Sequence, residues 1–384
     1  MAERIVYFNL KTPSVIRHSQ LAGFRRYATA RGWDVAAVPE DRSRPELVPG
    51  LLKRYGAAGA AVDCTGMSCD LPPELFSGLP VVYLGVHSSA YGDAAARIAV
   101  DDSSVARAAF RELAAGRPRA FAAVGFNGET EWSRERVGAF AKLARASGAP
   151  FRALPPRRNE PRGEWVRRLA KWLARLPRGA AVYAVSDHVA AAVAGAARIA
   201  SLRIPRDFTL VGSDDIAKIC ERCRPRLSSV RIDYDRTGFR AARMLDALID
   251  GRSGPPPAER IAPLLVVRRE STRGSGRTEA AVLSAVETIR REACDGLTAA
   301  ALASRVPGSR RLFEIRFREA TGHSVLDEIH QVRLEKVQTL LARPDMPISS
   351  IADFCGFKSY HVLHRLFKAR TGMTMLRWRK QHFG

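Results

Sequence analysis

Residues 309–322, Ser-Arg-Arg-Leu-Phe-Glu-Ile-Arg-Phe-Arg-Glu-Ala-Thr-Gly, return in similar form fifty positions later as residues 359–372, Ser-Tyr-His-Val-Leu-His-Arg-Leu-Phe-Lys-Ala-Arg-Thr-Gly. Each stretch opens on a serine suited to cap a helix, keeps apolar residues at helical spacing and closes on a glycine that ends the helix. Leu302-Ala303 and Ile351-Ala352 mark a short helix ahead of each stretch. The repeat therefore predicts two helix-turn-helix units, at about residues 297–322 and 348–372.

A two-helix unit of this kind places the N-terminal part of its second helix in the major groove of DNA. Phe313 and Phe317 share one helical stripe in the first unit, as Leu363 and Phe367 do in the second, so both pairs should face the core. The outward positions carry suitable side chains, since arginine pairs with guanine and glutamate accepts from cytosine. The predicted DNA-binding residues are Arg310, Arg311, Glu314, Lys358, Tyr360, His361, His364, Arg365 and Lys368.

Apolar residues between the two units recur at spacings of about three and four and predict one amphipathic helix that packs against both: Leu326, Ile329, Val332, Leu334, Val337, Leu340 and Leu341. Such a helix would set the distance between the recognition helices. Two recognition helices can read successive major grooves when about one helical turn of DNA, roughly 34 Å, separates them.

Residues 285–380 resemble the DNA-binding domain of the arabinose-operon-regulator (AraC/XylS-type) family. The resemblance lies in both units, in the connecting helix with Arg333-Leu-Glu-Lys-Val337, and in Ile348-Ser-Ser-Ile-Ala352 and Gly356-Phe357. Two positions depart from the family: Pro307-Gly308 stands in the first turn, and Met375 replaces the usual proline after Thr374. The resemblance implies sequence-specific binding to double-stranded DNA half-sites.

The polar, Gly/Ser-rich stretch Glu270–Arg277 reads as a linker, so we expect a sensor domain at 1–270, a linker at 271–280 and a helical domain at 281–384. Short β-rich runs alternate with helical stretches before the linker, which predicts parallel sheets in an α/β fold. The expected strands are Ile5–Leu10, Asp34–Val38, Ala57–Asp63, Pro80–Val86, Ala120–Gly125, Ala180–Ser186, Phe208–Gly212, Ser229–Ile232 and Leu264–Val267. Their number suggests two sheets.

This α/β part is similar to the sugar-binding lobes of lactose-repressor-type regulators and periplasmic binding proteins. The phrases that carry the resemblance keep their order along the chain: Leu21–Phe24, Arg31–Asp34, Val100–Asp102, Ser133–Phe140, Ser186–Ala190, Ile204–Asp215 and Leu227–Val230. The family fold has two doubly wound lobes joined by crossing strands, with the ligand beyond the carboxyl ends of the strands.

The resemblance implies that Arg136 and Asp187 bind a sugar, with Asp214 as a further contact, because charged partners bind sugar hydroxyls more strongly than neutral ones. Trp132 either stacks on a sugar face or packs in the core. Arg136 and Asp187 have an alternative reading as a structural ion pair or helix-cap features. The loop Asn9–His18 should supply further ligand contacts.

Sensor first and paired helix-turn-helix last is the layout of xylose-operon regulators, which the whole chain resembles. The resemblance implies a homodimeric, sugar-responsive activator of a catabolic operon that contacts RNA polymerase, with a monosaccharide such as xylose as effector. Two alternatives stay open. The sensor binds another small ligand or none, or the chain is a ligand-binding receptor whose helical tail docks a protein.

The formal charge of +23 favours polyanionic partners, yet only +7 of it lies in residues 276–384, so charge alone does not locate the DNA site. No apolar run spans a membrane and no signal peptide is evident, which predicts a cytoplasmic protein with reduced thiols. Cys220-Glu-Arg-Cys223 and the His361/His364 pair lack the further ligands that a zinc site needs. We therefore expect no metal, no cofactor and, in the absence of catalytic motifs, no enzymatic activity.

Overall fold

The computed structural model describes all residues except 1–2, 11, 66–69, 77, 87–94, 129, 158–159, 252–257, 273–275, 307, 342, 344–345 and 384. The chain forms two compact units. Unit 1 comprises residues 1–99, 234–259 and 281–384, and unit 2 comprises residues 100–233 and 260–280. Each unit contains one six-stranded sheet, and the helical C-terminal domain belongs to unit 1. No helix in the described part of the chain is long and apolar enough to cross a bilayer.

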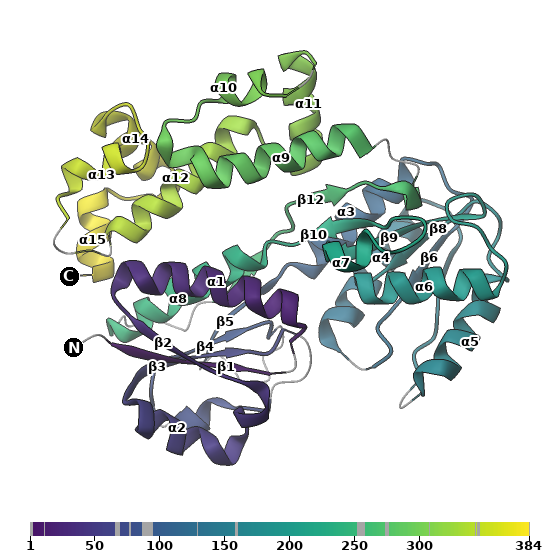
Figure 1. The fold of residues 1–384 in the computed structure, drawn as a ribbon, viewed down its shortest axis with the longest axis horizontal. Coiled ribbons are helices and arrows are strands. Elements are labelled where there is room, and N and C mark those ends of the chain that lie inside the picture. The colour runs from purple at the N-terminus through teal and green to yellow at the C-terminus, as the bar shows by residue number, and fades with distance from the viewer. Residues whose placement is uncertain are drawn as a thin grey trace. The chain divides into compact units, whose positions relative to one another are not determined.

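The sheet of unit 1 has the strand order β11-β5-β4-β3-β1-β2, and strands β1 to β5 run parallel. These strands are β1 (Arg4–Asn9), β2 (Asp34–Val38), β3 (Ala57–Asp63), β4 (Val81–Leu84), β5 (Ala96–Val100) and β11 (Ala258–Ile261). Helices α1 (Ser14–Arg31) and α8 (Tyr234–Ile249) cover one face, and α2 (Val48–Tyr55) lies on the other (Figure 1). Strands β1 and β3 are almost fully buried, as central strands of a parallel sheet must be.

Two glycines let α1 and α8 pack with their backbones in contact. A Cβ added at Gly238 would lie 1.8 Å from the carbonyl oxygen of Gln20, and one at Gly23 would lie 1.8 Å from that of Asp235. Because neither contact is with a flexible side chain, we expect Gly238→Ala to lower the free energy of unfolding by about 3 kcal/mol. Urea denaturation measures the loss. Gly195→Ala is the control, since the added methyl there meets nothing within 4 Å; equal losses in both variants would contradict the prediction.

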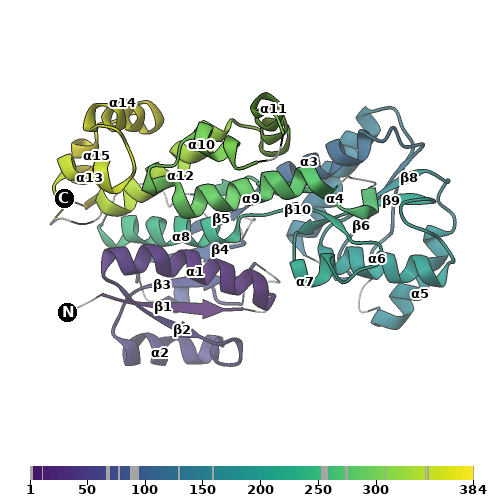
Figure 2. The same cartoon turned by 45° about the horizontal axis from the view of Figure 1, so that its top comes forward.

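The sheet of unit 2 has the strand order β12-β10-β9-β8-β6-β7 and is parallel except for β12, which runs antiparallel to β10. Its strands are β6 (Phe121–Val124), β7 (Phe151–Ala153), β8 (Ala180–Ala184), β9 (Phe208–Asp214), β10 (Ser228–Arg231) and β12 (Leu265–Val267). Its helices are α3 (Asp102–Ala114), α4 (Glu131–Ala146), α5 (Arg162–Leu173), α6 (Asp187–Ile199) and α7 (Ala217–Cys220). Figure 2 shows α3 and α4 on one side of this sheet and α6 on the other.

The C-terminal domain is entirely helical in its described residues. It consists of α9 (Gly276–Glu292), α10 (Ala299–Ser304), α11 (Arg310–Thr321), α12 (Val325–Leu341), α13 (Ile351–Phe354), α14 (Tyr360–Thr371) and α15 (Met375–Phe383). Elsewhere in the chain, short 3-10 turns occupy Glu40–Arg42, Pro45–Leu47, Pro73–Phe76 and Glu270–Thr272, and within this domain they occupy Ala293–Asp295 and Ile348–Ser350. The turn Glu270–Thr272 begins the expected linker, and its Ser271 is buried, where its hydroxyl donates to the carbonyl of Leu210.

The predicted α/β class with two sheets, followed by an all-α domain, is confirmed. All nine expected strands are present, with bounds that differ by at most two residues at either end. Strands β5, β7 and β11 were not predicted. Strand β7 is only three residues long and β11 alternates toward solvent, so neither has an apolar run to mark it.

Candidate DNA-binding and ligand-binding sites

The first helix-turn-helix unit is α10 and α11. Ser309 caps α11, because its hydroxyl accepts the N–H of Leu312, and Gly322 ends the helix in a left-handed conformation. Phe313 and Phe317 are buried as predicted. Local sequence determines this geometry, since the cap, the apolar stripe and the glycine stop all lie within fourteen residues.

The predicted DNA-reading residues of α11 lie on its solvent side. Arg310 and Arg311 are exposed. Arg310 forms an ion pair with Glu314 at 2.9 Å, one helical turn away on the exposed side of the helix. Leu312 and Ile315 are also exposed, at 42% and 46%, and were missed by sequence reasoning. Apolar side chains of this kind suit the methyl group of thymine.

The second unit is α13 and α14, and it repeats the design. Ser359 caps α14 by accepting the N–H of Val362, and Leu363 and Phe367 are fully buried. The predicted DNA-binding residues Lys358, Tyr360, His361, Arg365 and Lys368 are exposed, while His364 is half-buried. Tyr360 packs beside both His361 and His364, with ring centroids 6.1 and 5.8 Å apart. One aromatic cluster therefore forms the start of the recognition helix.

Helix α12 connects the two units, as the apolar spacing predicts. Its buried face includes Ile329, Leu334 and Val337, but Leu326 is 50% exposed and does not belong to it. The neighbouring Val325 takes the inward place instead, because it shares a helical stripe with Ile329. Arg333 is buried on this face and donates to the carbonyl oxygens of Ala293 and Leu297 at 2.8 Å, which joins α12 to the segment that follows α9.

A hydrogen bond joins His323, just before α12, to Glu328 in the first turn of that helix. His323 Nε2 lies 2.5 Å from Glu328 Oε2, and this hydrogen bond raises the pKa of the His323 imidazole above its usual value of 6.5. A raised folded-state pKa contributes stability that is complete below the unfolded value and is lost as the pH rises through the folded value. We therefore expect the melting temperature of the helical domain to fall as the pH rises above 6.5, the usual pKa of the imidazole. Thermal melts of wild type and His323→Gln measure this, and an equal slope in both would contradict it.

Arg136 of α4 is the centre of a buried charged cluster in unit 2. Its side chain is 4% exposed, and its Nε donates to Asp102 Oδ1 at 2.6 Å. Its Nη1 donates to the carbonyl of Val185 at 2.7 Å and lies 3.4 Å from Asp214 Oδ1. Trp132 lies beside it, with the guanidinium carbon 5.0 Å from the centroid of that ring system. The fold thus brings Arg136, Asp214 and Trp132 together.

Asp214 stands at the carboxyl end of β9 in an unusual backbone conformation. Its φ is +103°, and that of Asp215 is +55°, a region that non-glycine residues rarely adopt. Strain of this kind persists only where the surroundings fix the backbone, and it is frequent at binding sites. Here the carboxylate of Asp215 holds the backbone through ion pairs with Arg231 at 2.7 Å and Arg269 at 2.9 Å.

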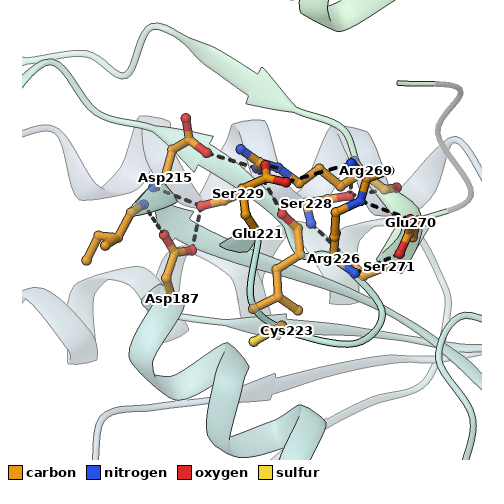
Figure 3. A network of polar contacts seen from close by, with 12 residues as sticks. Asp187, Asp215, Glu221, Cys223, Arg226, Ser228, Ser229, Arg269, Glu270 and Ser271 are labelled. Carbon is orange, nitrogen blue, oxygen red and sulfur yellow. Dashed lines mark hydrogen bonds and ion pairs between the residues drawn. The ribbon is translucent and has the colours of Figure 1, made fainter. Parts of the chain in front are cut away.

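Asp187 has a different environment from Arg136. Its two carboxylate oxygens accept the N–H of Ile216 and the hydroxyl of Ser229, both at 2.6 Å, and the side chain is fully buried (Figure 3). Burial, reinforced by the charge of Asp214, raises the pKa of the Asp187 carboxyl well above its usual range. A Cβ at Gly212 would lie 2.4 Å from Asp187 Oδ1, so only glycine admits this approach. These contacts join α6 to β9 and β10, which suits a residue that positions Asp214.

The loop after β1 was expected to supply further ligand contacts. In its described residues, Thr12 donates to Asp63 Oδ1 at 2.9 Å, and Asn9 Nδ2 donates to the carbonyl of Val38 at 2.7 Å. Asp63 also receives the Tyr7 hydroxyl and the N–H of Thr65. This polar cluster lies at the carboxyl ends of β1 and β3 in unit 1.

The described cysteines and histidines form no metal site. No group of three or more His, Cys, Asp or Glu side chains in the described residues could hold a metal ion. Cys220 and Cys223 are free thiols, and burial raises the pKa of the Cys223 thiol. Cys64 takes part in a disulfide, so the expectation of reduced thiols throughout is wrong for this residue. The absence of a secreted disulfide framework does not exclude a single disulfide, because bond formation depends on whether the fold brings two thiols together.

Comparison with known protein families matches both halves of the chain. A periplasmic binding protein-like domain matches residues 110–272, and a helix-turn-helix domain matches residues 302–381. The chain thus combines a periplasmic binding protein-like domain with a helix-turn-helix domain, as a DNA-binding transcription regulator does. The resemblance drawn from the sequence, and the DNA-binding function with it, are confirmed.

Several relatives share most of this regulator's length. The xylose operon regulatory protein of Escherichia coli K12 is 29% identical over 279 residues, which cover 71% of this chain and 70% of the relative. That of Haemophilus influenzae is 27% identical and covers 72% and 73%. The solved structure of a xylose-binding transcription activator shares the fold over 98% of both chains, at 23% identity and a TM-score of 0.59.

Proposed function

We propose that this regulator responds to a monosaccharide, with a pentose such as xylose as the first candidate, and activates a sugar-catabolic operon. The observation that supports a sugar is the buried cluster of Arg136, Asp102 and Asp214 beside Trp132, at the carboxyl end of a parallel sheet. Charged groups bind hydroxyls strongly, and an aromatic face can cover the apolar side of a pyranose ring. We assign sugar contacts to Arg136, Asp214 and Trp132, and a positioning role to Asp187.

The effector acts only through a difference in its affinity for two states of the protein. Within unit 1, Arg236 of α8 pairs with Glu335 of α12 at 3.1 Å, and Arg243 donates to Gln338 at 2.6 Å. These contacts join α8, which covers the sheet of unit 1, to α12, which connects the two helix-turn-helix units. They offer a direct path from the sensor to the spacing of the recognition helices. We propose that the protein works as a cytoplasmic homodimer on repeated half-sites and contacts RNA polymerase.

Selection of bound sequences from a random DNA pool, with and without a panel of pentoses and hexoses at fixed salt, tests this function. We expect a repeated half-site whose enrichment changes with one sugar. A half-site whose enrichment is the same with every sugar would contradict the proposal that the sensor binds a sugar. The absence of any enriched motif would contradict sequence-specific DNA binding. A turnover screen with sugars and sugar phosphates tests the expectation that the chain is no enzyme.

Single arginines of the two recognition helices should carry base specificity. We expect Arg311→Ala and Arg365→Ala each to weaken binding to the selected site by about 1–3 kcal/mol and to relax one base position. Arg370→Ala, an exposed arginine near the far end of α14 that pairs with Asp327, is the control. Fluorescence anisotropy on single-base variants of the site measures the effect. Equal weakening on every variant would identify phosphate contacts instead.

A further inference from the structure

Three parallel strands of unit 2 are each preceded by an arginine at the same offset. Arg119, Arg178 and Arg206 stand two residues before the first residue of β6, β8 and β9. The three strands are neighbours in the sheet (Figure 1). All three side chains are exposed. We call these residues the arginine row.

Hydrogen bonds between the loops fix the row. The N–H of Arg119 donates to the carbonyl of Gly179 at 3.2 Å, and the N–H of Gly179 donates to that of Asp207 at 2.7 Å. These bonds extend the ladder of the sheet beyond the strand ends. Neighbouring strands are about 4.8 Å apart, so the arginines start from adjacent, rigid rows of backbone.

The segments around the row are strongly basic. The four segments 115–120, 145–150, 174–179 and 201–207 contain seven arginines and one acidic residue, Asp207, and all seven arginine side chains are exposed. Asp207 Oδ2 accepts the backbone N–H of Arg203, which occupies part of that carboxylate.

None of the row's members has an ion-pair partner among the described residues, whereas Arg226, two residues before β10, pairs with Glu270 at 2.9 Å. Uncompensated like charges repel one another, and a bound polyanion would remove that repulsion.

The row is separate from the proposed sugar site. Arg136 and Asp214 meet at the carboxyl ends of the strands, whereas the row lies at the amino ends of strands in the same sheet. A small ligand at the first site therefore has no contact with the second.

The chemistry of the row suits phosphate better than a protein surface. Arginine guanidinium groups pair with phosphate oxygens in a fork geometry, and they are enriched where proteins bind nucleic acid. Protein interfaces need a buried apolar centre, yet among the described residues of unit 2 only Ile199 is a large exposed hydrophobic side chain. We propose that the arginine row binds the phosphate backbone of double-stranded DNA, as a second, sequence-independent contact besides the helix-turn-helix units.

The test compares full-length variants on a random-sequence duplex of about 60 base pairs. The row variant carries Arg119→Ser, Arg178→Ser and Arg206→Ser, and the matched control carries Arg107→Ser, Arg162→Ser and Arg167→Ser, which removes the same charge from exposed positions of α3 and α5. Each phosphate contact contributes about 0.9 to the slope of log affinity against log salt. We expect the row variant to lose about 2 to 3 from that slope and to bind at least about tenfold more weakly near 0.1 M NaCl, while the control matches wild type.

Equal slopes in the row variant, the control and wild type would overturn the proposal. Unchanged DNA binding together with weaker binding of fluorescent polyglutamate would overturn it too, and would assign the row to an acidic protein. Circular dichroism melts establish that the variants fold. The probe has no half-site, so the result is distinguishable from a failure of sequence selection.

Discussion

Replacing Arg136 with methionine should lower the free energy of unfolding of unit 2 by about 3–5 kcal/mol and abolish any response to sugar. The substitution keeps much of the side chain's volume but removes the guanidinium from two buried carboxylates. The Asp102 side chain is 0% exposed, and that of Asp214 is 6% exposed. Breaking a buried ion pair from one side costs this much because the remaining charge stays in a poorly solvated place. Urea denaturation of the full chain, followed by circular dichroism, measures the loss.

Arg134→Met is the matched control for this substitution. Arg134 lies on the same helix, two residues earlier, and is exposed, so its replacement should change the stability by less than about 0.5 kcal/mol. A double variant, Arg136→Met with Asp102→Asn, should recover part of the lost stability, since the amide carries no charge. It should not recover the sugar response, because the guanidinium is a proposed sugar contact. A loss below about 1 kcal/mol in Arg136→Met would show that the cluster adds little to the fold.

The DNA-binding domain could be predicted almost completely because its determinants are local. Ser309, Ser359, Gly322 and Gly372 mark helix ends within each repeat, and the structure places caps and left-handed stops at those residues. The error at Leu326 arose because two adjacent positions at the start of a helix fit the apolar spacing about equally well. Only the packed neighbours decide which of them turns inward.

The ligand cluster depended on contacts between distant residues, which a single sequence does not reveal. Arg136 and Asp102 are 34 positions apart, and no local pattern pairs them. Asp187 was expected to bind ligand directly, and in the structure its two oxygens also accept the N–H of Ile216 and the hydroxyl of Ser229, contacts that the sequence does not indicate. The arginine row was hidden for the same reason. Its members look like scattered surface charge until the sheet order makes them neighbours.

Phe367→Ala should remove DNA binding by unfolding the second helix-turn-helix unit, and Phe354→Ala should not. Phe367 is 0% exposed and packs on Trp378 with ring centroids 5.5 Å apart, within the core that also holds Leu363 and Met375. Truncating a buried phenylalanine to alanine costs about 3–5 kcal/mol, which is a large part of the roughly 5–15 kcal/mol that stabilises a typical domain.

Phe354 belongs to α13 of the same unit and is 59% exposed. The same truncation there therefore removes little buried apolar surface. Electrophoretic mobility shift on the selected half-site, together with thermal melts of the full chain, separates the two variants. We expect Phe367→Ala to lose the helical domain's transition and the shifted band while unit 2 keeps its own melt. If Phe354→Ala instead lost DNA binding with its stability intact, that exposed ring would have to contact DNA or a partner. The recognition surface would then extend from α14 onto α13.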